Sequence, residues 1–314
     1  MGTPRLDKII GGETDETTVK FGKPEINTEE LNGAHVLAND VTRTMLTDLS
    51  QAVFARAQDI LSRKGKKQQE AEIALAQLKE LNLLAVEYLL ECKRTSTPLT
   101  RLAQKEQLQN PTIGDLKCAT CGKAYRDENL SEGYSVSSLG RRLCASSHWM
   151  TVFVTDELLK AGVPQNSILW NLSEGGEEVD ILVEFMGELW ILELKDREFG
   201  SGDAHPLNYR QVRYKATRAI VVTTDKVSKD ARRVFEDLAK ERSGRSEVPV
   251  YIEGLGGIHD ALAAEVSRAS VRFAYQKLGV LSLLSGYDLR PIIAAKFGQP
   301  APGGSGPEQE MFYY

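Results

Sequence analysis

Residues 177–200, EEVDILVEFMGELWILELKDREFG, carry the clearest secondary-structure signal in this chain. Hydrophobic side chains occupy every second position along 178–185. After Met186 and Gly187, a second apolar run along 188–195 carries Leu189, Ile191, Glu193 and Lys195 at every second position. Alternation on both sides of a short glycine-containing turn is typical of a β-hairpin. The sequence therefore predicts two antiparallel strands joined by a tight turn.

Three charged side chains lie within these apolar strands, Asp180 on the first and Glu193 and Lys195 on the second. If the turn is Met186-Gly187, Asp180 lies opposite Glu193; if the turn begins one residue later, Asp180 lies opposite Lys195. All three share one face in either register, and directly opposed residues have Cβ atoms about 5 Å apart. Charge on an apolar strand is costly unless it is paired or binds a metal.

Two carboxylates at this separation can share one Mg2+ or Mn2+ ion, with water and phosphate as its other ligands. Such an ion polarises a phosphoryl oxygen and lowers the pKa of bound water, and a neighbouring ammonium group offsets developing negative charge. Asp180, Glu193 and Lys195 thus suit hydrolysis of a phosphodiester. A structural salt bridge between Lys195 and one carboxylate is the alternative, because charged pairs across hairpins are common.

The residues around the hairpin predict an α/β domain. Its expected order is helix, strand, the two hairpin strands, helix, strand, helix, strand and helix, over 149–161, 168–172, 178–195, 206–217, 219–224, 229–240, 248–252 and 258–269. A last helical segment is expected to end near Phe297.

The arrangement of Asp180 followed by Glu193-Leu194-Lys195 on adjacent strands resembles the motif of the PD-(D/E)XK nuclease superfamily. The stretches AIVVTTDKVSKDARRVFEDLA (219–239) and VYIEGLGGIHDAL (250–262) are similar to the Mrr-like restriction endonuclease branch. The resemblance covers residues 149–269. It implies a restriction-endonuclease-like core of helix, three-strand meander, helix and strand.

The resemblance also implies roles for the residues that match the motif. Mg2+ would be bound by the side chains of Asp180 and Glu193 and by the carbonyl of Leu194. Lys195 would be the catalytic lysine. Many members carry a carboxylate on the first helix, for which Glu157 is the candidate, and some carry a glutamine on the helix after the motif, for which Gln211 is the candidate. The chain departs from the family pattern at Val179, where a proline is usual, and at Tyr214, which lies one residue nearer to Gln211 than expected.

A cysteine segment precedes this domain. Cys118 and Cys121 form a C-x2-C pair, and Cys144 and His148 follow at C-x3-H spacing. Two such pairs supply the four ligands of a tetrahedral structural Zn2+ site. The alternative is a set of reduced core thiols with a helix-capping histidine. Cys92, on a predicted helix outside this set, is expected to be a buried apolar residue.

Two helical patterns, 36–64 and 67–93, precede the cysteine segment. They predict an antiparallel helical hairpin, which would serve packing, homodimerisation or binding of a partner protein. The expected organisation is a flexible polar N-terminus, the helical hairpin, a zinc-binding module, the nuclease domain, a C-terminal helix and a flexible tail: 1–35, 36–97, 98–148, 149–269, 270–297 and 298–314.

The composition of the 314 residues is that of a globular protein, with 41% hydrophobic and 26% charged residues. The start, MGTPRLDKII, lacks the apolar core of a signal peptide, and no stretch approaches the ~20 apolar residues of a membrane span. We therefore expect a cytoplasmic protein without a membrane partner. The net charge of −5 disfavours non-specific nucleic-acid binding, but ten basic against six acidic residues between 193 and 233 predict a local basic face.

These patterns support two hypotheses of function. The first is a Mg2+-dependent endonuclease acting on DNA, with RNA as an alternative substrate and restriction or anti-phage defence as its role; the resemblance implies products with 5′-phosphate and 3′-hydroxyl ends. The second is a nuclease-like nucleic-acid-binding or scaffolding subunit of a larger complex. Intact Asp180, Glu193 and Lys195 favour the enzyme.

Overall fold

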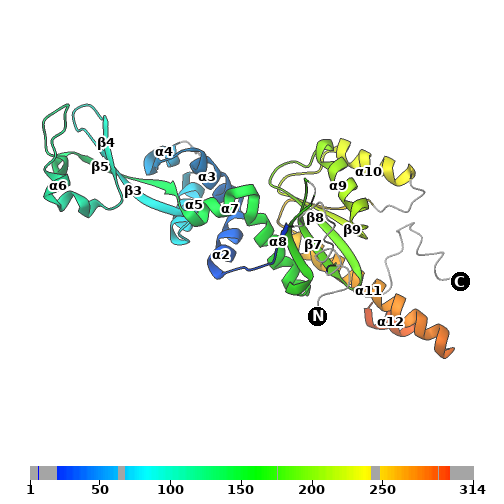
Figure 1. Ribbon diagram of the computed structural model, residues 1–314. Helices are drawn as coiled ribbons and strands as arrows, with labels where there is room; N and C mark the ends of the chain where they lie inside the picture. Colours follow the sequence, from blue (N-terminus) through cyan, green and yellow to red (C-terminus); the bar gives the residue numbers. More distant parts are fainter. Residues whose placement is uncertain are drawn as a thin grey trace. The chain divides into compact units, whose positions relative to one another are not determined.

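The chain folds into two compact units, each with its own β-sheet (Figure 1). Unit 1 comprises Met1–Glu25 and Met150–Tyr314, and unit 2 comprises Ile26–Trp149. This computed structural model describes residues 6, 20–62, 68–174, 176–241, 248–288 and 290–297. The predicted tail at 298–314 lies outside the described residues.

The sheet of unit 1 has six strands in the order β1-β6-β7-β8-β9-β10. Their bounds are Lys20–Gly22, Ile168–Glu174, Glu177–Phe185, Glu188–Lys195, Arg218–Thr223 and Val250–Glu253. β6, β7 and β8 pair antiparallel, β1 adds antiparallel to β6, and β9 and β10 run parallel to β8. Parallel neighbours need crossover connections, which helices supply here. Unit 1 is therefore a mixed α/β structure.

Five α-helices and one short 3-10 helix belong wholly or largely to the described part of unit 1. They are α8 (His148–Lys160), η5 (Gln165–Ser167), α9 (Ser201–Arg213), α10 (Lys229–Glu241), α11 (Ile258–Ser285) and α12 (Arg290–Phe297). α9 connects β8 to β9, and α10 connects β9 to β10. The expected break after residue 269 is absent, because α11 continues without interruption to Ser285. Among the described residues, no helix is both long and apolar enough to cross a membrane.

The two faces of this sheet are covered by different helices. Leu189 and Ile191 of β8 belong to a buried cluster with Leu207 of α9 and Phe235 of α10, so α9 and α10 cover that face. The even-numbered residues of β8, among them Glu188, point to the opposite face of the sheet, since side chains alternate along a strand. There, Arg272 of α11 pairs with Glu188 at 2.6 Å, and Thr155 of α8 accepts a hydrogen bond from Trp170 of β6 at 2.8 Å.

The hairpin turn adopts the first of the two registers considered. Met186 and Gly187 both have positive φ, 50° and 77°, as a two-residue type I′ turn requires. Phe185 accordingly pairs with Glu188. Positive φ is easy for glycine, while Met186, which is exposed, adopts a conformation that few non-glycine residues take.

The N-terminal segment is more structured than predicted. Residues 1–35 were expected to be flexible, but β1 and most of α2 (Thr28–Leu37) fall within that range. Leu6 is buried in the sheet cluster, and its amide donates to Glu184 Oε2 at 2.8 Å. Asn27 caps α2 by accepting from the Glu30 amide, a signal that the sequence prediction overlooked.

Unit 2 contains helices and a four-stranded sheet in the order β2-β5-β3-β4. Its elements are α2, α3 (Asp40–Gln51), β2 (Ala55–Arg56), α4 (Ala57–Ser62), α5 (Gln68–Glu80), β3 (Leu84–Glu91), β4 (Pro98–Leu102), η2 (Lys105–Gln109), α6 (Pro111–Gly114), η3 (Tyr125–Asp127), β5 (Asn129–Val136), α7 (Ser138–Cys144) and η4 (Ala145–Ser147). The predicted helical hairpin over 36–97 is therefore wrong. Its first helix is divided into shorter elements, and the end of its second helix is strand β3.

The helix predicted over 67–93 ends early because of Asn82. This residue has a φ of 54°, and the amide of Leu83 donates to the carbonyl of Leu78 at 2.9 Å. A left-handed residue followed by this bond is a Schellman C-cap, which stops a helix. The next residues, from Leu84, then pair with β5 in an eight-residue antiparallel ladder.

Candidate active site and metal-binding groups

The hairpin brings Asp180 and Glu193 together on the face covered by α9. Leu182 pairs with Ile191 in the buried cluster beneath that helix. The same register, continued by two residues on each strand, places Asp180 opposite Glu193. Lys195 follows Glu193 on the same face by the same alternation.

Glu193 is 4% exposed and contacts two cations. Its Oε1 accepts from Lys195 Nζ at 2.8 Å, and its Oε2 accepts from Arg210 Nη1 at 2.5 Å. Arg210 lies one turn after the buried Leu207 on α9, so it points toward the sheet. Its Nε also donates to Glu177 Oε2 at 3.0 Å. Sequence reasoning missed Arg210 as a member of the site, although its three-residue spacing from Leu207 was a usable signal.

Asp180 is the least compensated carboxylate of the group. Its Oδ2 accepts from the Leu194 amide at 2.7 Å. Burial and the negative charge of Glu193 raise the pKa of Asp180 to about 7, and the Leu194 amide and Lys195 only partly offset them. Two carboxylates that face each other at close range repel, and a shared divalent cation stabilises such a pair. The donor set of Asp180 and Glu193 therefore fits such an ion.

Lys195 is held between two carboxylates. Its Nζ lies 2.8 Å from Glu193 and 3.9 Å from Asp203 Oδ1. Asp203 also accepts two bonds of 2.8 Å from Arg197, and these bonds keep the pKa of Asp203 below its usual value. Lys195 itself retains a partly exposed side chain. The ammonium group thus lies beside the acidic pair and still reaches solvent.

The other two predicted site residues make different contacts. Glu157 is buried on α8, where it accepts from Lys160 Nζ at 2.8 Å and lies 3.0 Å from Nδ1 of His259 on α11. These contacts do not join it to the Asp180–Glu193 pair. Gln211 is buried on α9 beside Arg210, and its Oε1 has no hydrogen-bond partner among the described residues. An unsatisfied buried acceptor calls for water or another ligand.

The basic residues between 193 and 233 are largely used within the fold. Five arginines in this segment pair with carboxylates of unit 1: Arg197, Arg210, Arg213, Arg218 and Arg232. The expected basic face is therefore much reduced in charge. This outcome agrees with the usual fate of charge runs, which pair with neighbours or face solvent.

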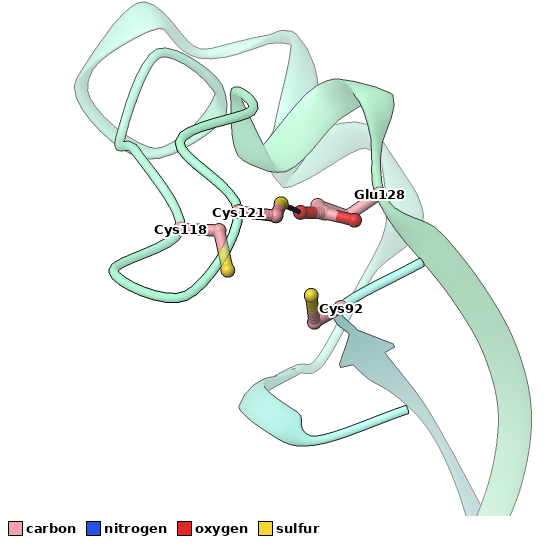
Figure 2. A group of neighbouring side chains, drawn as sticks. All are labelled: Cys92, Cys118, Cys121 and Glu128. Atoms are coloured by element: carbon pink, nitrogen blue, oxygen red, sulfur yellow. Dashed lines mark hydrogen bonds between the residues drawn. The ribbon is translucent and has the colours of Figure 1, made fainter. Parts of the chain in front are cut away.

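The structure divides the predicted zinc ligands between two places. Cys118 and Cys121 lie together, and their sulfur atoms form a group with Cys92 Sγ and the Glu128 carboxylate in which all atoms lie within 4.8 Å of one another (Figure 2). Cys144 is the last residue of α7, and His148 is the first residue of α8. Both follow the C-terminal end of β5, whereas Glu128 precedes its N-terminal end. Cys92 was expected on a distant helix. It instead follows β3 directly, which brings it to the pair.

Comparisons with known proteins leave the family open. No protein-family model matches the chain, and no curated protein matches it significantly. Protein VC1899 from Vibrio cholerae aligns with a TM-score of 0.47 at 13% identity, over 81% of this chain and 59% of that chain. Can2 from Sulfobacillus thermosulfidooxidans, solved in complex with cyclic tetra-adenylate, aligns with a TM-score of 0.40 at 10% identity, over 79% of this chain and 56% of that chain.

A repair endonuclease from Pyrococcus abyssi aligns with a TM-score of 0.24 at 12% identity, over 60% of this chain and 95% of that chain. The chain spans less than two thirds of the length of the first two structures. At these TM-scores none of the alignments bears on what the chain does. The function must therefore be argued from its own residues.

Proposed function

We propose that the chain is a nuclease dependent on Mg2+ or Mn2+ that hydrolyses phosphodiester bonds of DNA. The observation that carries the proposal is that Asp180, one position beyond the last ladder pair of Ile181 with Leu192, accepts from the Leu194 amide next to Glu193 at 2.7 Å. The Lys195 ammonium lies 2.8 Å from Glu193. The order of α8, three antiparallel strands, α9 and β9 also supports it, since the resemblance to PD-(D/E)XK nucleases implies that order.

The proposed chemistry assigns separate tasks to the side chains. A cation held by Asp180, Glu193 and the Leu194 carbonyl would polarise a phosphoryl oxygen and lower the pKa of bound water. Lys195, beside this pair and open to solvent, orients the attacking water and offsets negative charge as it develops. Arg210 neutralises Glu193 without a metal, and its bond to Glu177 gives it a second partner when a cation takes Glu193.

DNA is the proposed substrate, and RNA is the outcome to be distinguished from it. The ends expected by resemblance are 5′-phosphate and 3′-hydroxyl. A role in restriction or anti-phage defence is also part of the proposal, and it is supported by the resemblance alone. Sequence specificity depends on groove contacts outside the hairpin.

Cleavage assays on the purified full-length chain test the proposal. Double-stranded DNA, single-stranded DNA and RNA are each incubated with Mg2+, Mn2+ or a chelator. We expect cleavage only with a divalent ion, and a loss of about 10²-fold or more in Asp180→Asn and Lys195→Ala. Glu198→Gln is the matched control, because it removes a carboxylate from an exposed position just after β8. Cleavage that survives both site variants contradicts the assignment.

One observation favours the alternative of a nuclease-like binding or scaffolding subunit. Both oxygens of Glu193 are engaged by cationic side chains, which is how a purely structural ion-pair cluster also looks. The two functions differ in metal binding. A scaffold predicts that Mg2+ and Mn2+ leave the hairpin unchanged while a partner complex forms, whereas the nuclease predicts an ion bound at Asp180 and Glu193.

A further inference from the structure

The segment between β3 and β5, residues 92–128, forms a lobe that we call the cysteine lobe (Figures 1 and 2). It has little hydrophobic core of its own. Its buried apolar side chains are Leu102 and Ala124, together with the sulfur-bearing Cys92 and Cys118. Leu116, in contrast, is half exposed. A lobe of this size with so few buried side chains needs a cross-link or a metal to hold one conformation.

Two of the four clustered residues meet because of the β3–β5 ladder. The last pair of that ladder is Glu91 with Asn129. Cys92 follows Glu91, and Glu128 precedes Asn129. Cys92 and Glu128 therefore face each other at the next position of this antiparallel pair of strands. The Glu128 carboxylate is also anchored from the β3 side, because its Oε2 accepts from the Lys93 amide at 2.6 Å.

The other two residues come from a tight turn across the lobe. The amide of Gly122 donates to the Cys118 carbonyl at 2.8 Å, and the amide of Cys118 donates to the Lys123 carbonyl at 2.8 Å. Gly122 has a φ of +77°, which favours glycine at that place. The turn is joined to the β3 side by Arg94, whose Nη2 donates to the Thr120 carbonyl at 2.7 Å. In Figure 2 the Cys118 sulfur points to the side of Cys92, and the Cys121 sulfur lies against the Glu128 carboxylate.

We propose that the sulfurs of Cys92, Cys118 and Cys121 and the carboxylate of Glu128 bind one structural Zn2+ ion. Four ligand atoms within 4.8 Å of one another suit this ion, because tetrahedral zinc at a Zn–S distance of about 2.3 Å separates its sulfur ligands by roughly 3.8 Å. The contact of 2.6 Å between Cys121 Sγ and Glu128 Oε1 shows that the two side chains converge on the same space.

The surroundings of the sulfurs match those of a metal site. Cys92 and Cys118 are almost fully buried, so these ligands are shielded from water.

The ligand chemistry selects zinc among common metals. Three thiolates exclude Mg2+ and Ca2+, which prefer oxygen ligands. An iron–sulfur cluster is held by four cysteines in its usual forms, and this group has three. A site closed by four protein ligands, without a free position, is typical of structural rather than catalytic zinc.

This ligand set differs from one that uses Cys144 and His148. β5 runs from Asn129 to Val136, and at about 3.3 Å per residue its two ends are roughly 23 Å apart. Glu128 lies at one end of that strand. Gly140 of α7 packs against Leu83 and Val136 at the other end. Cys144 and His148 therefore belong to the opposite end of the ladder from the clustered sulfurs.

Metal analysis of the full-length chain, purified under reducing conditions without chelator, tests the site. We expect about one zinc ion per chain, and a Co2+-substituted form with the sulfur-to-metal charge-transfer absorption of a tetrahedral thiolate site. Cys92→Ser and Glu128→Gln should lower the zinc content or weaken retention against a competing chelator at least tenfold. Cys144→Ser and His148→Ala are the matched controls and should retain zinc fully.

Three results would overturn the proposal. They are a zinc content near zero in the untreated protein, unchanged zinc retention in both Cys92→Ser and Glu128→Gln, and loss of zinc in Cys144→Ser or His148→Ala. Limited proteolysis gives a second readout that does not depend on variant folding. Removal of zinc by chelator from the wild-type chain should expose cleavage sites within 93–127, and readdition of zinc should protect them again.

Discussion

Replacement of Asp180 by asparagine should stabilise the metal-free protein, and the gain should depend on pH. The substitution keeps the shape of the side chain and an oxygen that can accept from the Leu194 amide. It removes the charge that burial and Glu193 make unfavourable, the causes that raise the pKa of Asp180 from 3.8 to about 7.

The magnitude follows from this difference in pKa. One pKa unit corresponds to about 1.4 kcal/mol, so the shift corresponds to about 4 kcal/mol, reduced to about 2–4 kcal/mol by movement of Lys195 and Arg210 toward the ionised group. The folded-state pKa lies above the unfolded value, so the neutral acid stabilises the fold below about pH 4. That contribution is lost as the pH rises to about 7. Asp180→Asn should therefore equal the wild type near pH 4 and exceed it by the full amount at pH 8.

Urea unfolding in chelator, followed by tryptophan fluorescence between pH 4 and pH 8, measures this difference. Trp170 and Trp190 are buried in the sheet of unit 1 and report on the relevant structure. Glu198→Gln, at an exposed position, is the control and should show no comparable dependence on pH. An Asp180→Asn variant that is destabilised at pH 8, or whose advantage is the same at every pH, would refute the account of this carboxylate.

Substitutions at three further positions have defined outcomes in urea unfolding, for which the buried Trp149 reports on unit 2, and Mn2+ binding is measured separately for the first. Arg210→Gln should lower the free energy of unfolding by about 2–4 kcal/mol without metal, because Glu193 loses a buried partner, and it should tighten Mn2+ binding. Stability and Mn2+ affinity equal to those of the wild type would show that Arg210 is not the counter-charge of Glu193. Asn82→Val should lower the free energy of unfolding by about 1–3 kcal/mol, whereas Asn82→Gly should change it little, because the residue that ends α5 must adopt a left-handed conformation. Equal effects of the two substitutions would contradict this cap. Gly140→Ala should cost about 1–3 kcal/mol, because its Cβ would clash with the Leu83 carbonyl, and a neutral effect would show that α7 can shift.

The sequence was informative where local pattern and burial agree. Period two on both sides of Met186-Gly187 predicted the hairpin, and the common face of Asp180 and Glu193 followed from it. The register needed the structure, because a turn one residue later is equally consistent with the pattern. α9 was expected to begin near Pro206, yet it begins at Ser201 and contains that proline. The proline removes one backbone hydrogen bond, which the rest of the helix tolerates.

The errors share a physical cause, which is that long-range pairing overrides local preference. Leucine spacing continued through residues 84–91, but Asn82 ends the helix and β5 supplies strand partners that lie far away in sequence. The cysteine group depends on the same pairing. Cys92 and Glu128 become neighbours only when β3 meets β5, so no spacing rule could join them to Cys118.

The side-chain contacts of the candidate active site were also beyond sequence reasoning. Gln211 was identified by resemblance, whereas Arg210, which contacts Glu193 directly, was counted only as part of a basic segment. Glu157 was a candidate by its place on α8, but the choice of partner depends on α11, which supplies His259. Contacts between helices that are distant in the chain decide such assignments.

Mn2+ titration of the full-length chain at pH 8, followed by electron paramagnetic resonance, tests most directly whether the hairpin is a divalent-cation site. Asp180→Asn and Glu193→Gln remove the proposed ligands, and Glu198→Gln is the control at an exposed position. We predict that the wild type and Glu198→Gln bind Mn2+ with equal affinity and that each ligand variant binds it at least tenfold more weakly. Equal Mn2+ binding by all four proteins, or none by the wild type, would contradict the account.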